Sequence, residues 1–278
     1  FIKSDEYDSL RNAAICLWKL GEKNEAFRKL KLSYEKSHDP QLLHEVIHVS
    51  NLLGKPSFDE LEPLIAGDLK KPLRDDTVTV LAACLNRSGR HSDAKRLLES
   101  HNYVPCEGGE GAVSDVWINA NKALADEKFA AGDYESALRL YREAADLPDN
   151  LGSGYWNDAK KAPLWFGEGS CLEKLGDPDG AREKYHMITL LLTDFFSDMG
   201  LPELDIWKIR ALKRLGQNSD ADAIKVSARE RWTFERDRID SGYFATTPFF
   251  DCFNSEADAR EQRFEKFDRL LKLLDSER

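Results

Sequence analysis

The string H-E-x-x-H that begins at His44 has the most specific chemical potential in the chain. On a helix, His44 and His48 share one face and can chelate zinc, and Glu45 between them can act as general base toward a bound water. A zinc hydrolase also needs a third protein ligand. The extended form of the motif requires glycine where Asn51 stands and histidine where Gly54 stands, so the motif is incomplete.

Glu60 or Glu62 could be considered as a third zinc ligand, but both fall on the next short helix of a repeat hairpin. We therefore expect His44 and His48 to be solvated surface histidines, and we predict no metal site. A zinc-dependent hydrolase built on residues 44–48 remains a remote alternative.

Two glycine-rich segments place carboxylates and aromatic rings where they could recognise a sugar. The first contains Glu107 and Glu110, and the second contains Tyr155 and Trp156. Sugar hydroxyls donate to carboxylates, and a pyranose face stacks on an aromatic ring. The competing interpretation, which we favour, is that the glycines turn the chain and the aromatic rings cover the gap between repeat units.

Motifs for other catalytic chemistries are missing from the sequence. It contains no G-x-x-x-x-G-K-[ST], G-x-G-x-x-G or G-x-S-x-G string, so phosphate cradles and serine nucleophile elbows have no support. We predict that the protein is not an enzyme and that it has no cofactor.

The composition narrows the class of protein. Its 278 residues carry 40 Lys and Arg against 50 Asp and Glu, a net charge of -10, and 41% of the residues are hydrophobic. This balance predicts a folded soluble protein, and the anionic surface disfavours phosphate backbones. The anionic surface therefore argues against a nucleic acid as partner. Because no apolar run approaches about 18 residues, we expect no membrane as partner either.

The five cysteines are odd in number, far apart and without a C-x-x-C pair, so we expect buried free thiols in a reducing compartment. Phe1 is not an initiator methionine, and we expect a piece of a longer, cytoplasmic protein. The cysteines are Cys16, Cys84, Cys106, Cys171 and Cys252.

The elements that would position all these residues follow an internal repeat. A glycine ends one amphipathic stretch, and an alanine five residues later lies in the next one. The apolar spacing predicts a helix on each side, and the glycine supplies the left-handed residue that ends the first helix. The glycines are Gly21, Gly54, Gly89, Gly132, Gly176 and Gly216, and only Gly54 lacks the alanine, because Asp59 stands there.

A small residue seven positions before the glycine and a large one nine positions after it complete a small-small-large pattern. Together with Pro148 this pattern resembles the tetratricopeptide consensus. The resemblance implies one domain over residues 1–278. Its repeat units would be residues 7–39, 40–73, 75–104, 114–148, 160–192 and 202–232, followed by a C-terminal segment and capping helix over 233–278.

In the tetratricopeptide family, certain first-helix positions line a concave groove that binds peptides. In this sequence those positions hold His44, His48 and Asn51 in one unit, and Lys122, Asp126 and Phe129 in another. These groove residues carry charges of both signs, and they lack the arrangement with which some members of the family bind a terminal carboxylate. A groove that is solvated, or filled by another part of the parent chain, remains an equal alternative. The other positions hold Asp8, Arg11, Trp18, Asp76, Thr79, Asn86, Phe166, Ser170, Glu173, Arg210 and Lys213.

Four strings in order, DPQLLHEVIHVSNLLGK, NYVPCEGGEGAV, LPDNLGSGYW and SGYFATTPFFDCF, resemble a second family. It is the C-terminal helical half of large bacterial proteins of unknown function that carry a galactose-mutarotase-like β-sandwich upstream. The resemblance covers residues 39–253, and it implies a carbohydrate-linked parent whose sandwich would hold any sugar site.

Taken together, the repeats predict an all-α, tetratricopeptide-like superhelix of about six helix hairpins plus a capping helix. The expected function is a non-catalytic scaffold for protein-protein or domain-domain interaction. Its partner would be a protein or peptide in the groove, or the upstream sandwich of the same parent. An accessory role, with loops that complete a carbohydrate site on the sandwich, is the main alternative.

Overall fold

The structure is a computed structural model that describes residues 4–104, 110–152, 158–191, 201–239, 252–253 and 255–277. Over these ranges it contains thirteen α-helices and no strand. The predicted all-α class is therefore confirmed. Among the helices described, none is long and apolar enough to cross a membrane.

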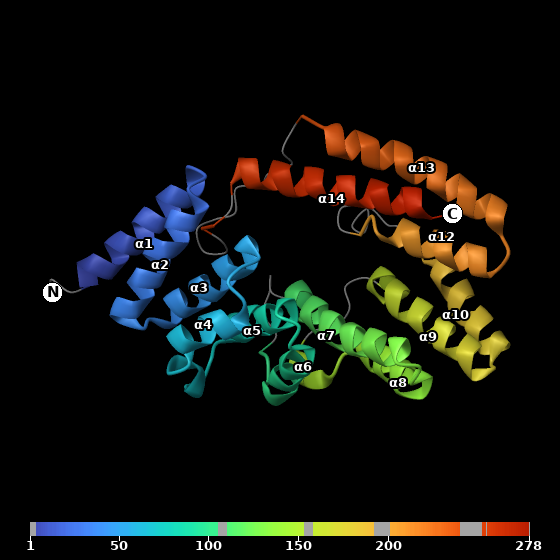
Figure 1. Cartoon of the computed structure of the whole chain (residues 1–278), viewed down its shortest axis with the longest axis horizontal. Helices are drawn as coiled ribbons and strands as arrows, with labels where there is room; N and C mark the ends of the chain where they lie inside the picture. Colours follow the sequence, from blue (N-terminus) through green and yellow to red (C-terminus); the bar gives the residue numbers. More distant parts are fainter. Residues whose placement is uncertain are drawn as a thin grey trace. The chain divides into compact units, whose positions relative to one another are not determined.

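The contacts between Cα atoms divide the chain into two units. Unit 1 comprises Phe1–Ala120, Pro148–Ser153 and Phe244–Ser255. Its helix pairs are visible in Figure 1, where α1 lies beside α2. The α-helices of unit 1 are α1 (Ser4–Lys19), α2 (Lys23–Ser37), α3 (Pro40–Leu53), α4 (Phe58–Ile65), α5 (Asp75–Arg87), α6 (His91–Ser100) and the first half of α7 (Glu110–Ala130).

Unit 2 comprises Asn121–Leu147, Gly154–Tyr243 and Glu256–Arg278. Its helices pack in chain order, α8 on α9, α9 on α10, α10 on α12, α12 on α13 and α13 on α14. Whether the two units form one continuous array stays a prediction. The α-helices of unit 2 are the rest of α7, α8 (Tyr134–Ala145), α9 (Ala162–Leu175), α10 (Pro178–Leu190), α12 (Leu204–Arg214), α13 (Asn218–Asp237) and α14 (Glu256–Ser276).

The repeated glycine ends the first helix of every hairpin, as predicted. All six glycines have positive φ, between 68° and 84°. The residue after each glycine donates its N–H to a carbonyl five residues back, as Arg90 does to Leu85 at 2.9 Å and Gln217 to Leu212 at 2.9 Å. This bond satisfies a carbonyl that the helix end would leave without a partner. One turn geometry therefore serves both units.

The predicted small residues lie where paired helices cross. In the first hairpin, Ala14 of α1 and Ala26 of α2 are fully buried. In α9, a Cβ added to Gly169 would stand 2.7 Å from Cε1 of Tyr185, a distance that carbon atoms do not tolerate. The small residues therefore set how closely the two helices of a hairpin approach.

The hairpin at Gly54 departs from the pattern because its turn is two residues longer. Helix α4 begins four residues after the glycine, whereas α2, α6, α8, α10 and α13 begin two residues after theirs. The Lys55–Pro56 peptide bond in this turn is cis. The shift puts Leu61 and Ile65, both almost fully buried, in the places of the missing alanine and of the large residue. Asp59 is therefore free to face solvent, and its side chain is 72% exposed.

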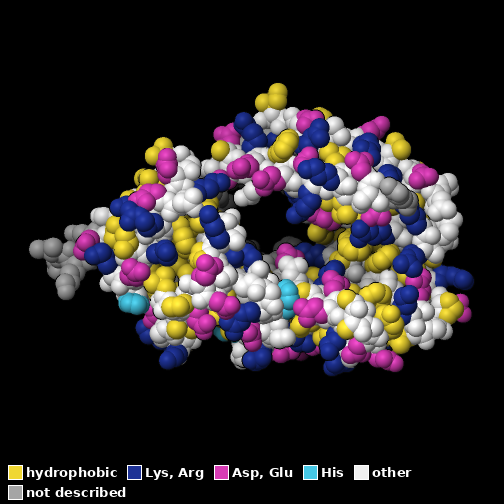
Figure 2. All heavy atoms as spheres, in the orientation of Figure 1, with side chains coloured by type: hydrophobic (Ala, Val, Ile, Leu, Met, Phe, Trp, Pro, Cys, Tyr) yellow, Lys and Arg dark blue, Asp and Glu magenta, His cyan; other side chains and the backbone are white. Residues whose placement is uncertain are grey.

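First helices of neighbouring hairpins also contact one another, since α3 packs on α5 and α9 on α12. The last hairpin is covered by α14, the helix predicted to close the array. Trp232 of α13 and three leucines of α14, Leu270, Leu271 and Leu274, are buried in one cluster with residues of α12. On the surface, Figure 2 shows Lys and Arg side chains interspersed with Asp and Glu over the face in view.

The expectation of buried cysteines is correct for only two of the described thiols. Cys84 and Cys171 are buried, but Cys16 is exposed and Cys252 is partly exposed. Cys16 lies two positions after the buried Ala14, on the opposite side of α1. Cys106 is outside the described residues.

Candidate binding surface on the first helices

The two histidines of the H-E-x-x-H string lie one turn apart on α3, as predicted. Asp39 caps this helix by accepting from the N–H of Gln41 at 2.8 Å. The rings of His44 and His48 stack with centroids 5.8 Å apart and an interplanar angle of 9°.

The expectation that both histidines are solvated is wrong, because α5 packs on α3 and leaves both only partly exposed. The side chain of His44 is 16% exposed, and its Nδ1 lies 3.8 Å from Oδ1 of Asp76. Burial lowers the pKa of His44, and the nearby Asp76 carboxylate only partly offsets this effect.

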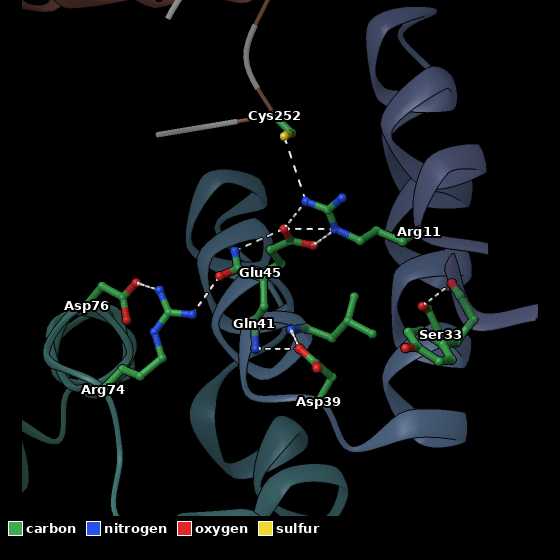
Figure 3. Close-up of polar contacts among 10 residues, drawn as sticks. Arg11, Ser33, Asp39, Gln41, Glu45, Arg74, Asp76 and Cys252 are labelled. Carbon is green, nitrogen blue, oxygen red and sulfur yellow. Dashed lines mark hydrogen bonds and ion pairs between the residues drawn. The ribbon is translucent and has the colours of Figure 1, made fainter. Parts of the chain in front are cut away.

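Glu45 belongs to another set of contacts (Figure 3). Its carboxylate accepts from Nη2 of Arg11 at 2.5 Å, from Nε of Arg11 at 2.8 Å and from Nε2 of Gln41 at 3.1 Å. The Glu45 side chain is 6% exposed. A base for a metal-bound water needs a free lone pair facing that water, and here the carboxylate is taken up by a guanidinium and an amide.

The two glutamates considered as a third zinc ligand also have other partners. Glu60 accepts from the N–H of Ser57 at 2.8 Å in the capping box of α4, and Glu62 faces Arg90 at 3.9 Å. Within the described ranges, no group of three or more His, Cys, Asp or Glu side chains is placed to hold a metal ion. The three carboxylates that a zinc hydrolase would use, Glu45, Glu60 and Glu62, thus have other partners.

Arg11 and Glu45 begin a polar line that crosses three first helices. Gln41 links Glu45 to Arg74, whose Nη1 donates to Oε1 of Gln41 at 2.7 Å. Nη2 of Arg74 then donates to Oδ2 of Asp76 at 2.6 Å. The sequence placed Arg11 and Asp76 at groove positions but gave no sign of the links between helices, because Arg11 and Glu45 are 34 residues apart and Gln41 and Arg74 are 33 apart.

Asn51 completes the α3 contribution to this surface. Its Nδ2 donates to the carbonyl of Val80 at 2.8 Å, and its Oδ1 accepts from Nε of Arg87 at 3.3 Å. Both partners are on α5, so the amide serves helix packing. Of the three predicted residues on α3, the two histidines lie together and Asn51 has a structural role.

A distant segment of the chain lies on the first-helix surface of unit 1. The ring of Phe253 meets that of Trp18 edge-on, with centroids 5.8 Å apart, and each residue is 3% exposed. Beside it, Nη2 of Arg11 lies 3.8 Å from Sγ of Cys252. Both Arg11 and Trp18 are predicted groove positions. Part of this surface is therefore filled by the chain itself, which is one of the two alternatives that the sequence left open.

In unit 2, the predicted residues of α7 contact their own hairpin. Nζ of Lys122 donates to Oδ2 of Asp126 at 2.6 Å, and the Tyr141 hydroxyl donates to Oδ1 of Asp126 at 2.5 Å. Phe129 meets Tyr134 edge-on at 5.3 Å. Burial, followed by the bond to Asp126, raises the pKa of Tyr141.

Three other groove positions of unit 2, Phe166 of α9 with Arg210 and Lys213 of α12, line one pocket of about 270 Å³. Arg214 and Glu277 complete its lining. The register of the sequence repeat therefore predicted three of the five residues that line this pocket. Glu277 was missed because it lies outside the repeat pattern.

Most of the predicted loop residues cannot be placed. Glu107, Tyr155 and Trp156 lie outside the described residues, and Glu110 is the first residue of α7, with a side chain that is not described. In the described part of the second glycine-rich segment, Asn150 has a structural role. Nδ2 of Asn150 donates to the carbonyls of Leu98 at 2.8 Å and of His101 at 2.7 Å, which ties the loop to the end of α6.

A scan against protein-family models finds no family that matches this chain. The two resemblances drawn from the sequence motifs therefore remain hypotheses.

Proposed function

We propose that this protein is a non-catalytic, tetratricopeptide-like scaffold whose first-helix surfaces bind protein segments. The glycine turns, the small residues at helix crossings and the contacts between neighbouring first helices support the repeat type. In line with the second resemblance, the scaffold would serve as the C-terminal part of a larger bacterial carbohydrate-related protein. The free thiols of the described cysteines support a cytoplasmic location.

One observation carries the proposal. Cys252 and Phe253 come from far along the chain, yet they lie against Arg11 and Trp18, at positions that line the binding groove of this repeat type. An aromatic anchor in an apolar contact with a charge beside it is typical of a protein interface. A surface that binds a segment of its own chain is suited to bind similar segments of a partner or of another domain.

The test adds a labelled peptide that copies residues 244–255 to the chain and follows its fluorescence anisotropy. In the natural chain the tethered segment competes at high effective concentration, so we expect weak binding. In the Phe253→Ala variant the tethered anchor is lost, and the peptide should bind at least about tenfold more tightly. The same peptide with alanine in place of the anchor phenylalanine should not bind.

Two variants control the experiment. Phe234→Ala removes a phenylalanine that is 65% exposed and should behave like the natural chain. Trp18→Ala, introduced together with Phe253→Ala, should abolish peptide binding. A folded Phe253→Ala chain that does not bind the peptide would refute a segment-binding role for this surface.

A further inference from the structure

The filled contact of unit 1 shows which groups surround an aromatic anchor in this chain. The ring of Phe253 meets that of Trp18 edge-on, with centroids 5.8 Å apart. Beside this contact, Nη2 of Arg11 reaches both the carboxylate of Glu45 and the thiol of Cys252 (Figure 3). The anchor therefore meets an aromatic ring, and the guanidinium next to it already has a carboxylate partner.

The pocket of unit 2 contains the same kinds of groups. Its aromatic wall is Phe166 of α9, and the lining is completed by Arg210, Lys213, Arg214 and Glu277. Most of the exposed lining is carbon, although four of these five residues are charged. A cavity of about 150 Å³ holds a benzene ring, and this pocket has a volume of about 270 Å³. It is therefore large enough for one phenylalanine side chain.

The cations of the pocket have partners within the chain, so the pocket does not require an acidic ligand. Oε1 of Glu277 accepts from Nε of Arg210 at 2.7 Å, and Oε2 of Glu173 accepts from Nη1 of Arg214 at 2.6 Å. Lys213 has an interaction partner as well. The Glu277 side chain is only 13% exposed, so its ion pair with Arg210 is a fixed part of the pocket wall.

Neighbouring rings pack on the aromatic wall. The ring centroid of Phe166 lies 5.3 Å from that of Tyr185 and 5.6 Å from that of Trp207. Cζ of Arg210 lies 4.8 Å from the centre of the Trp207 ring, and Cζ of Arg214 lies 5.9 Å from that of Phe166. Guanidinium groups also stack on aromatic rings, so the two arginines add to the surface that an aromatic ligand can contact. Because these contacts exist before a ligand arrives, less entropy is lost on binding.

We propose that this pocket binds a phenylalanine side chain of a partner protein segment, with its ring on Phe166, as the ring of Phe253 lies on Trp18 in unit 1. Both ion pairs of the pocket stay closed in the complex, and no residue of the chain is displaced. This inference rests on the proposed scaffold function and names the side chain that the surface of unit 2 recognises.

The probe is an acetylated and amidated peptide, Gly-Ser-Ser-Phe-Ser-Ser-Gly, with 4-fluorophenylalanine at its centre. Its fluorine NMR signal should shift and broaden when the natural chain is added, and an unchanged signal would overturn the proposal. Unlabelled peptides then compete with the probe. The phenylalanine peptide should displace it, whereas peptides with alanine or glutamate at the centre should need concentrations at least about tenfold higher. Equal competition by the glutamate peptide would show that the pocket recognises charge, and the proposal would be wrong.

Substitutions of Phe166 locate the binding. Phe166→Ala removes the aromatic wall, so the affinity for the probe should fall at least about tenfold. Phe166→Leu keeps an apolar side chain of similar length beside Tyr185 and Trp207, and it should weaken binding about threefold through the loss of the ring contact. Thermal unfolding checks that each variant is folded, and Phe166→Leu decides the question if Phe166→Ala does not fold.

Phe234→Ala is the matched control. It removes a phenylalanine that is 65% exposed on α13 and does not line the pocket, so the probe should bind this variant as it binds the natural chain. Folded Phe166 variants that bind the probe normally would show that the peptide binds elsewhere, and the proposed site would be wrong.

This test is independent of the one for residues 244–255, because all its variants lie in unit 2. Binding of the probe that depends on Phe166, without binding of the copied peptide by the Phe253→Ala chain, would retain the pocket and remove the segment-binding role of unit 1. The converse result would retain that role and overturn the pocket.

Discussion

The two units use their first-helix surfaces differently. In unit 1, Trp18 is covered by Phe253, and Glu45 is neutralised by Arg11. In unit 2, the corresponding surface has a pocket in which Arg210 pairs with the carboxylate of Glu277. The hairpins of both units are nevertheless built with the same glycine turn and the same small residues.

This difference shows that the repeat pattern specifies the hairpins but not the use of their surface. Residues at helix crossings must be small wherever the hairpin occurs, since close packing depends on them. Groove positions carry no such requirement, so a hydrophobic contact can close them in one unit and a charged pocket can leave them open in the other. In unit 1 Phe253 covers Trp18, and in unit 2 the corresponding positions line a pocket.

The largest predicted effect is a difference in stability loss between variants of two ion pairs, Arg11–Glu45 in unit 1 and Arg210–Glu277 in unit 2. Arg11→Ala would leave Glu45 buried in the middle of α3 with only Gln41 as partner, and a buried charge without its counterion costs about 3 kcal/mol. Arg210→Ala should cost less, about 1 kcal/mol, because the side chain of Glu277 is more exposed than that of Glu45 and follows the last residue of α14. Urea unfolding followed by circular dichroism measures both losses.

Amide hydrogen exchange then assigns each loss to its unit. Exchange should accelerate in α1 and α3 of the Arg11→Ala variant and stay unchanged there in Arg210→Ala. Equal losses of stability in the two variants would mean that Glu277 is held as firmly as Glu45, and the contrast between a closed and an open surface would disappear.

A smaller effect tests what the units share. Gly89 in unit 1 and Gly216 in unit 2 have φ of 74° and 76°, where an alanine is strained. Each substitution by alanine should therefore reduce the free energy of unfolding by about 1 kcal/mol, and by the same amount in both units. Thermal unfolding of the two variants checks the equality.

Gly67→Ala is the control for the glycine pair. Its φ is -64°, and an added Cβ meets nothing within 4 Å, so alanine should leave the stability unchanged or raise it by up to about 1 kcal/mol. A loss at Gly67 equal to that at Gly89 would show that the effect does not come from the left-handed turn.

The sequence predicts the hairpins well because their determinants are local. Gly21 and Ala26 are five residues apart, so the turn and the crossing can be read within one window of the chain. The hairpin at Gly54 was harder, because the two-residue extension of its turn moves Leu61 into the place that the regular spacing assigns to Asp59. A search that allows turns of different length would have found it.

The candidate site was less predictable because its contacts join distant residues. Register placed Arg11 and Trp18 on the groove, but nothing in the local sequence links them to Cys252 and Phe253. The H-E-x-x-H string left the partner of Glu45 open for the same reason. Its spacing describes one face of α3, whereas the direction of Glu45 is decided by a guanidinium on α1.

The smallest effect concerns pH and the surface of unit 1 alone. Burial lowers the pKa of His44 in the folded chain, while Asp76 raises it and His48 and Arg74 lower it further. Because the unfolded chain then binds more protons below its pKa of about 6.5, the free energy of unfolding should fall as the pH is lowered from 7 through this range. His44→Gln removes this titration, so the variant should lose less stability than the natural chain over the same interval in urea unfolding at a series of pH values. If the free energy of unfolding depends on pH equally in the two chains, His44 has the same pKa in the folded and unfolded states. If the His44→Gln variant loses more stability than the natural chain, the Asp76 contact outweighs burial in setting the charge of His44.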